Sequence, residues 1–343
     1  MTNRAKLRGT ISGFGEVAAR AHLAGWRTRE NIAIGAIHDP ISERRHEAIR
    51  LIKSVRVYDD LELMLDGEAP DFVDVASPPG LHRDAARAAL AAGAHVLVEK
   101  PLALTLSEFD ELAALAAEKH RIMMCVHNWK YAPAYAVARR AIETGRLGAI
   151  RLISIDRLRT APAGAGGSGG KWRSSASSGG GILIDHGWHV FYLIYWLLGG
   201  DSPLAVSAYL ESPPGLDVDD VADVRIRFGS GALSRAHLSW RAPIRRTSAL
   251  IYGERASLEI EGDRVTLTER SGAVKDLSVA DMADDSYHSA WFAGVAAEFE
   301  QAVTEGTDSL VAKRNLAEAR VALKLIDAAR KSSIKSGVEI NIS

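Results

Sequence analysis

The sequence predicts an α/β protein: a doubly wound parallel sheet comes first, and a second α/β domain with a large, mostly antiparallel, open sheet follows. Short apolar segments alternate with helical patterns up to about residue 127, which is typical of a parallel sheet covered on both faces. The turn Gly13-Phe14-Gly15 joins the first of these segments to the first helix. After residue 199, extended segments follow one another with little helix between them, which favours an antiparallel sheet with helices on one side.

The first domain is predicted to alternate between strands and helices along its whole length. The expected strands are residues 7–12, 31–37, 56–58, 72–75, 95–98 and 121–126. The expected helices are residues 17–24, 42–51, 61–65, 83–92 and 107–119. We expect the domain boundary near residue 127, so that residues 1–127 form the first domain and residues 128–343 the second.

The second domain is predicted to be richer in strands. Its expected strands are residues 149–158, 204–210, 221–228, 232–240, 247–252, 256–260 and 264–268. Its expected helices are residues 132–143, 182–198, 289–303 and 313–331, the last of which is expected to reach back to the first domain. Residues 161–181 are rich in Gly and Ser and too long for a tight turn, which indicates a mobile or functional loop.

Composition and charge narrow the classes of function. The chain has 343 residues with 42 basic and 43 acidic side chains, a balance that gives no reason to expect nucleic acid or an acidic membrane as a partner. The longest apolar stretch, residues 190–198, is too short to cross a bilayer. The single cysteine, Cys125, excludes an internal disulfide and lies in an apolar run typical of a core. With no stretch like a signal peptide at its start, the chain is predicted to be cytoplasmic.

The first glycine-rich turn matches a dinucleotide-binding fingerprint. Gly13-Phe14-Gly15-Glu16-Val17-Ala18 has the form G-x-G-x-x-G/A, directly after an expected strand and before an expected helix. The first glycine makes a tight turn, the second lets the backbone approach a pyrophosphate, and the small third residue lets helix and strand pack closely. The alternative, a plain glycine turn, stays open. The fingerprint predicts a Rossmann domain in which residues 13–17 contact the cofactor.

Two further strand ends complete the expected nucleotide site. Asp39 stands about twenty residues after the fingerprint, where a carboxylate accepts hydrogen bonds from the adenosine ribose and repels a 2′-phosphate, so NAD is favoured over NADP. Arg44 and Arg45 follow closely and keep NADP open as an alternative. Ser77 and Pro78 follow the fourth expected strand and would border the nicotinamide half of the cofactor.

Lys100 is the first candidate for chemistry. The apolar run of residues 96–98 ends in Glu99-Lys100-Pro101, and ligands of open α/β sheets bind just beyond the carboxyl ends of such strands. Pro101 fixes its own φ and restricts the residue before it, so the backbone of the lysine is held. The alternative is an ordinary surface lysine.

Asp185 and His189 are the second candidate. They are four residues apart, so on a helix they share one face, and a carboxylate beside an imidazole holds the ring. Such a pair suits a base that takes a hydroxyl proton while hydride leaves the carbon for nicotinamide. The alternative is a surface ion pair. His186 falls on another face and is predicted to be structural, and two such groups without a third ligand do not predict a metal site.

These residues together resemble the Gfo/Idh/MocA oxidoreductases, a family that includes glucose–fructose oxidoreductase and inositol dehydrogenases. Three motifs in this order carry the resemblance: Gly13-x-Gly15-x-x-Ala18, Glu99-Lys100-Pro101, and Gly179-Gly180-Gly181 followed by Asp185-x-x-x-His189. The resemblance implies a Rossmann domain followed by an α/β domain whose open sheet forms the oligomer interface. It implies a cis peptide before Pro101, with Lys100 bonding the reacting oxygen, His189 acting as acid and base, and Asp185 alongside.

The resemblance also enlarges the expected site. The cofactor-binding set becomes Gly13, Phe14, Gly15, Glu16, Val17, Asp39, Ser77, Pro78, His82, Glu99 and Lys100. The substrate-binding set becomes Lys100, Asn128, Lys130, Trp172, Arg173, Asp185 and His189. The chain departs from the family pattern at Tyr192, where an acid is frequent, and at Lys130, where an arginine is frequent.

The function expected from this resemblance is an NAD- or NADP-dependent dehydrogenase acting on a secondary alcohol of a sugar, cyclitol or related polyol. A glycosidase that retains its NAD and a non-catalytic nucleotide-binding regulator of the same fold are the alternatives. We expect a small-molecule substrate, no nucleic-acid or membrane partner, and a homodimer or homotetramer formed through the sheet of the second domain.

Overall fold

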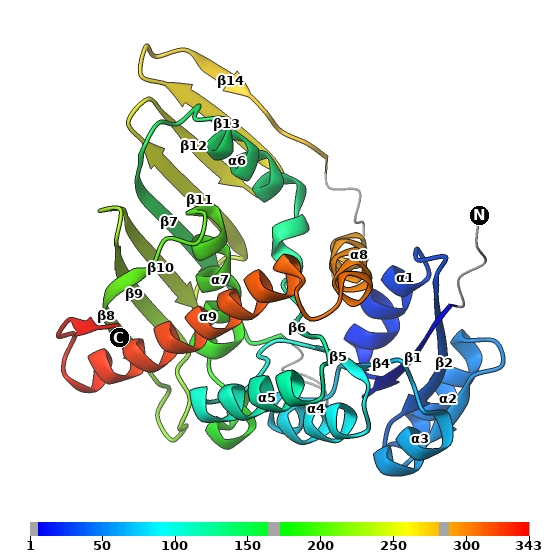
Figure 1. Cartoon of the computed structure of the whole chain (residues 1–343). Coiled ribbons are helices and arrows are strands. Elements are labelled where there is room, and N and C mark those ends of the chain that lie inside the picture. Colours follow the sequence, from blue (N-terminus) through cyan, green and yellow to red (C-terminus); the bar gives the residue numbers. More distant parts are fainter. Residues whose placement is uncertain (1–5, 164–171, 281–287, 343) are drawn as a thin grey trace. The chain divides into compact units, whose positions relative to one another are not determined.

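The computed structural model describes residues 6–163, 172–280 and 288–342. Contacts within the chain divide the described residues into two units. The first unit holds residues 6–128 and 288–319, and the second holds the described parts of residues 129–280 together with residues 320–342 (Figure 1). The chain first passes from one unit to the other after Asn128, next to the position near residue 127 where the boundary was expected. Each unit is built around its own sheet.

The first sheet is parallel throughout and has the strand order β3-β2-β1-β4-β5-β6. Its strands are β1 (Leu7–Ser12), β2 (Ile32–His38), β3 (Arg56–Tyr58), β4 (Phe72–Val75), β5 (His95–Val98) and β6 (Met123–Cys125). Its main helices are α2 (Ser42–Leu51), α3 (Leu61–Glu68), α4 (His82–Ala91) and α5 (Leu106–Glu118). This is the doubly wound sheet that the sequence predicted, and the order reverses between β1 and β4, where such sheets bind ligands.

The first helix differs from the single helix expected over residues 17–24. A π-helical turn, η1 (Ala18–His22), comes first, and a short α-helix, α1 (Leu23–Trp26), continues it. π-turns inside helices are frequent at functional sites. Here the turn carries His22, which is fully buried, into the interior of the first unit.

Helix α8 (Ser289–Glu305) belongs to the first unit although it comes late in the chain. Its Phe292 and Phe299 pack edge-on against Trp26, with ring centroids 5.5 and 6.0 Å away, and Phe299 also meets Phe72 of β4. The expected second domain of residues 128–343 therefore differs from the observed unit, because this aromatic cluster joins residues 288–319 to the first sheet.

The last helix, α9 (Leu310–Ile334), closes the open edge of β6. The side-chain amide of Asn315 accepts from Cys125 N at 2.7 Å and donates to Cys125 O at 2.9 Å. One side chain thus satisfies the two backbone groups that a neighbouring strand would otherwise satisfy. Beside it, Glu318 lies 2.9 Å from Nδ1 of the buried His127.

The second sheet has nine strands in the order β14-β13-β12-β11-β7-β10-β9-β8-β15, and all neighbours are antiparallel except β7 and β10. Its strands are β7 (Ile150–Leu158), β8 (Pro203–Glu211), β9 (Val221–Phe228), β10 (Leu233–Ser239), β11 (Arg246–Gly253), β12 (Ala256–Glu261), β13 (Arg264–Glu269), β14 (Val274–Asp276) and β15 (Ile340–Asn341). The predicted mostly antiparallel sheet is confirmed, and the sequence analysis missed only its two short edge strands, β14 and β15.

Helices cover one face of this second sheet. The longer ones within the unit are α6 (Pro133–Glu143), which contacts β13, and α7 (Trp188–Leu197). Strand β9 alternates accordingly, with Val224 and Ile226 buried between exposed Arg225 and Arg227. The helix expected over residues 182–198 begins with a π-helical turn, η6 (Leu183–Gly187), and continues as α7.

Candidate functional site

The glycine-rich turn after β1 has the geometry that a dinucleotide requires. Gly13 has φ +90°, and a Cβ there would lie 2.6 Å from the backbone N of Ser77, so only glycine fits where β1 and β4 end side by side. A Cβ at Gly15 would meet nothing within 4 Å, so the backbone there is open to a ligand. Glu16 and Val17 are exposed beside it. Phe14 is fully buried, so its ring packs in the interior of the unit.

Asp39 ties this turn to the end of β2. Its Oδ2 accepts from Phe14 N at 2.7 Å and its Oδ1 accepts from Ile41 N at 2.9 Å. Each carboxylate oxygen has a second lone pair, so both can still accept a hydroxyl hydrogen from a ribose. Arg45 donates to Asp39 O, and Arg44 lies 3.4 and 3.3 Å from two glutamate carboxylates, so both arginines already have partners.

Two side-chain oxygens near the carboxyl ends of β4 and β6 have unused hydrogen-bonding capacity. Ser77 Oγ and Asn128 Oδ1 are buried and have no hydrogen-bond partner within the part of the chain that the structure describes. Buried polar atoms normally have hydrogen-bond partners, so each of these two oxygens needs an explanation. A ligand with hydrogen-bonding groups at this edge of the sheet supplies one, and both residues were predicted to contact cofactor or substrate.

Glu99 anchors Lys100 at the end of β5. Glu99 Oε2 accepts from Lys100 N at 2.8 Å, and Glu99 Oε1 lies 3.1 Å from Nε2 of His22. Burial by itself raises the pKa of Glu99, but the hydrogen bond and attraction to His22 outweigh burial, so the pKa is lowered. The Lys100–Pro101 peptide is cis, as the family resemblance implies. Glu99, expected at the cofactor, thus uses its carboxylate to hold the backbone of Lys100.

His22 connects this anchor to the middle of the sheet. Its Nδ1 lies 2.9 Å from Oδ2 of Asp74, a fully buried carboxylate in β4 that also accepts from Trp26 Nε1 at 2.7 Å. Its ring stacks on Phe292 at 3.9 Å. Burial alone lowers the pKa of His22, but Asp74 and Glu99 outweigh burial and raise it from 6.5 to about 9. The sequence did not predict this ion-paired cluster, because a histidine in an apolar helix has no distinguishing local pattern.

His82 joins the two loops that follow β4 and β5. Its Nδ1 lies 2.7 Å from Pro101 O, and its Nε2 lies 2.7 Å from Ser77 O. Carbonyl oxygens only accept, so both contacts favour a ring with hydrogen on both nitrogens, whereas burial favours the neutral ring and lowers the pKa of His82. The ring, expected at the cofactor, therefore holds the loops that carry Ser77 and Lys100.

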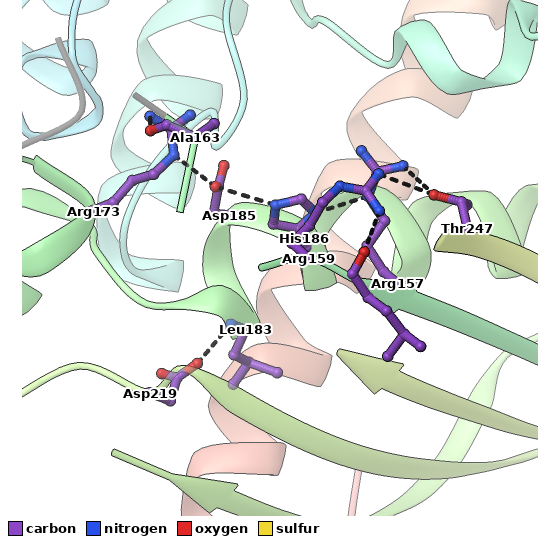
Figure 2. A network of polar contacts seen from close by, with 10 residues as sticks. Arg157, Arg159, Ala163, Arg173, Leu183, Asp185, His186, Asp219 and Thr247 are labelled. Atoms are coloured by element: carbon purple, nitrogen blue, oxygen red, sulfur yellow. Dashed lines mark hydrogen bonds and ion pairs between the residues drawn. The ribbon is translucent and has the colours of Figure 1, made fainter. Parts of the chain in front are cut away.

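In the second unit, Asp219 caps the start of η6, the helical turn that carries Asp185. Asp219 Oδ2 accepts from Leu183 N at 2.6 Å (Figure 2). In addition, Asp219 O accepts from Ile182 N at 2.8 Å. Gly181 has φ +100°, and a Cβ there would lie 2.6 Å from Asp219 Oδ1. Gly181 is therefore required both for its backbone conformation and for the approach of this capping carboxylate.

Asp185 is buried and paired with Arg173. The Arg173 Nε donates to Asp185 Oδ2 at 2.8 Å, and the guanidinium also lies over the Trp172 ring at 4.3 Å. His186 Nε2 lies 3.6 Å from the same carboxylate oxygen (Figure 2). Arg173, predicted together with Trp172 to bind substrate, thus holds the Asp185 carboxylate. Residues 164–171 of the predicted glycine-rich loop lie outside the described residues.

His189 is held by an aromatic partner and a hydroxyl. Its ring stacks on Trp129 with centroids 4.5 Å apart and planes 7° apart, and its Nδ1 lies 3.2 Å from Tyr192 Oη. Tyr192 Oη also accepts from Trp129 N at 2.9 Å. Tyr192, which stands where the family often has an acid, is therefore a neutral partner of the histidine. Lys130, predicted to bind substrate, is buried one residue further along.

The described residues offer no cluster of three or more His, Cys, Asp or Glu side chains suited to a metal ion. Across the same ranges, no helix has the length and apolar character needed to span a membrane. Cys125 is buried, and burial raises the pKa of its thiol, which is the behaviour of a core cysteine.

Comparisons with known proteins agree with this fold. Residues 7–127 match the model described as "Oxidoreductase family, NAD-binding Rossmann fold", and residues 135–259 match the "GFO/IDH/MocA C-terminal domain". The protein is thus an oxidoreductase whose first domain binds NAD. More specifically, the chain belongs to the Gfo/Idh/MocA family.

Two relatives similar to this chain are named as dehydrogenases of D-glucoside and D-apiose. The D-glucoside 3-dehydrogenase of Escherichia coli is 26% identical over 300 residues, which cover 82% of this chain and 84% of the relative. The D-apiose dehydrogenase of Paraburkholderia graminis is 28% identical and covers 78% of this chain and 71% of its own. Among solved structures, an inositol dehydrogenase homolog from Azotobacter vinelandii complexed with NAD⁺ has a TM-score of 0.86 at 22% identity, covering 98% of both chains, which shows the shared fold.

Proposed function

We propose that the protein is an NAD-dependent dehydrogenase that transfers a hydride between nicotinamide and a secondary alcohol or ketone of a sugar, cyclitol or related polyol. The main support for this proposal comes from the residues at the carboxyl edge of the parallel sheet. There the open backbone at Gly15 and the orphaned oxygens of Ser77 and Asn128 fit a dinucleotide, and Glu99 anchors Lys100 at the adjacent strand end. Relatives named as dehydrogenases of D-glucoside and D-apiose support the substrate class.

The proposed roles follow from the contacts of each side chain. Bound NAD would supply the hydride acceptor. Lys100 would donate a hydrogen bond to the reacting oxygen, and Asp185, held by Arg173, would orient a substrate hydroxyl. His189 would take the hydroxyl proton at Nε2 while its Nδ1–H is donated to Tyr192 Oη, which has lone pairs for both Trp129 N and the imidazole.

The proposed cofactor preference is NAD over NADP. Asp39 places a buried carboxylate at the end of β2, where it would accept from the ribose hydroxyls and repel a 2′-phosphate. Arg44 and Arg45 are engaged by Glu16, Glu47 and the backbone of Asp39, which reduces their capacity to bind a phosphate.

The test is to incubate the protein with a panel of polyols, inositols and sugars and with NAD⁺ or NADP⁺. The absorbance of reduced nicotinamide measures the reaction in each case. Lys100→Ala and His189→Ala are each expected to lower turnover by at least ~10²-fold while NAD binding persists. Lys119→Ala, at an exposed helix end, is the matched control. Wild-type rates in both site variants would reject these assignments. Release of a leaving group from a glycoside without net reduction of NAD⁺ would favour the NAD-retaining glycosidase instead.

We further propose a cytoplasmic homodimer or homotetramer that forms through the uncovered face of the nine-stranded sheet. Leu233 and Tyr252, on β10 and β11, are 50% and 53% exposed, and large exposed apolar side chains on a sheet face favour association. Light scattering on the purified protein measures the mass, and a monomer at micromolar concentration would contradict the proposal.

A further inference from the structure

Arg157 of strand β7 contacts two separate parts of the candidate site. Its Nε donates to His186 Nδ1 at 3.0 Å, and its Nη1 donates to Thr247 Oγ1 at 2.8 Å (Figure 2). Its guanidinium carbon lies 4.3 Å from the centroid of the Trp129 ring. One planar side chain thus makes directed hydrogen bonds at its edge and a stacking contact on its face.

The hydrogen bond to His186 determines where that imidazole carries its proton. A guanidinium N–H only donates, so Nδ1 of His186 must accept, and the ring hydrogen is then on Nε2. Nε2 faces Asp185 Oδ2 at 3.6 Å, so the N–H dipole points its positive end toward the carboxylate. At this distance the interaction is electrostatic rather than a full hydrogen bond. Arg157 therefore orients a ring that stabilises the charge of Asp185.

The contact with Trp129 reaches His189. The Trp129 ring that Arg157 covers also stacks on the His189 ring, nearly parallel at 4.5 Å. The backbone N of the same tryptophan donates to Tyr192 Oη, which lies 3.2 Å from His189 Nδ1. A change in the position of Trp129 would consequently move both the stacking partner and the hydroxyl partner of the histidine.

The environment of Arg157 is unusual for a purely structural arginine. Burial, followed by repulsion from Arg159, lowers the pKa of Arg157 to about 9. Within the described ranges its direct partners are an imidazole, a threonine hydroxyl and an indole, and no carboxylate is bonded to it. Attraction to Tyr135 and, after it, to Asp185 favours its charged form. Arg157 is half-buried, and a cation removed from much of its water without a bonded carboxylate costs stability, so its presence here needs a compensating role.

We propose that Arg157 is a positioning residue that orients both Asp185, through His186, and His189, through Trp129. This inference rests on the proposed roles of Asp185 and His189. It assigns to one half-buried guanidinium the alignment of two groups that lie on different turns, η6 and α7.

The kinetic test compares Arg157→Gln and Arg157→Lys with Arg151→Gln, a matched control at an exposed position of the same strand. Both Arg157 variants are expected to lower kcat about 10- to 100-fold with KM changed less than about threefold, because alignment rather than binding is lost. Lysine keeps the charge but not the forked donor and flat face, so it should rescue little. Added guanidinium should restore turnover in an Arg157→Ala variant. Activity equal to that of Arg151→Gln would overturn the proposal.

A second measurement is independent of activity. In wild-type protein labelled with ¹⁵N-histidine, the His186 signals should report a neutral ring with hydrogen on Nε2, and Arg157→Gln should convert them to a mixture of tautomers. A ring with hydrogen on Nδ1 in the wild type would refute the arrangement even if no substrate is found. If Lys100→Ala and His189→Ala lower turnover but Arg157→Gln does not, the positioning role fails while the proposed function stands.

Discussion

The buried ion cluster around His22 predicts how the stability of the protein changes with pH. His22 lies between Asp74 and Glu99, and its pKa is raised from 6.5 to about 9. A raised pKa means that the folded protein holds the proton more tightly than the unfolded chain. The corresponding stability is fully present below pH 6.5 and is lost as the pH rises through 9. For a shift of this size the contribution is roughly 3 kcal/mol.

The perturbation is His22→Gln, which keeps hydrogen-bonding capacity but has no proton to lose. The free energy of unfolding, measured by urea denaturation and circular dichroism between pH 6 and pH 9.5, should fall by about 3 kcal/mol more in the wild type than in the variant. His46→Gln, at an exposed position on α2, is the matched control and should follow the wild type.

Equal pH dependence in the wild type and in His22→Gln would refute this reasoning. If the variant does not fold, the same question can be put to the wild type alone, by NMR titration of ¹⁵N-labelled histidines. The His22 ring should then titrate near pH 9, and titration near 6.5 would show that Asp74 and Glu99 do not hold its proton.

Two further substitutions test the sheet edge and the glycine turn. Gly13→Ala is expected to destabilise the protein and weaken NAD binding at least tenfold, because its Cβ would lie 2.6 Å from the Ser77 backbone at φ +90°; fluorescence titration with NADH checks this, and unchanged affinity would contradict it. Asn315→Ala removes both bonds to Cys125 and is expected to cost about 2 kcal/mol in thermal unfolding; faster amide exchange at Cys125 should accompany it, and its absence would show that the edge is protected otherwise.

The parts that the sequence predicted depend on local patterns. The alternation of apolar strands and amphipathic helices predicted the parallel sheet, because each strand must be apolar on both faces to be buried there. Gly13 and Gly15 were recognised because their backbone roles depend only on neighbouring residues in a strand–turn–helix. Asp185 and His189 were selected by their spacing and predicted to pair with each other, whereas the structure shows Arg173 beside Asp185 and Tyr192 beside His189.

The parts that the sequence did not predict depend on residues that are distant along the chain. His22 contacts Asp74 and Glu99, which follow it by 52 and 77 positions. A periodic pattern reports only on residues close together in the chain and does not predict such a pairing. Arg157 and His186 are 29 residues apart, in a strand and a helical turn. In the same way, nothing local to residues 289–305 indicates that their aromatic side chains pack on Trp26.

The amino-acid sequence by itself therefore determined which elements form, where the dinucleotide turn lies, and which few polar side chains end the strands. Only the tertiary structure decided which charges neighbour one another. The physical reason is that strand and helix preference arises from contacts within a few residues, whereas the state of a buried ionisable group is decided by whichever partner folding brings within about 3 Å of it.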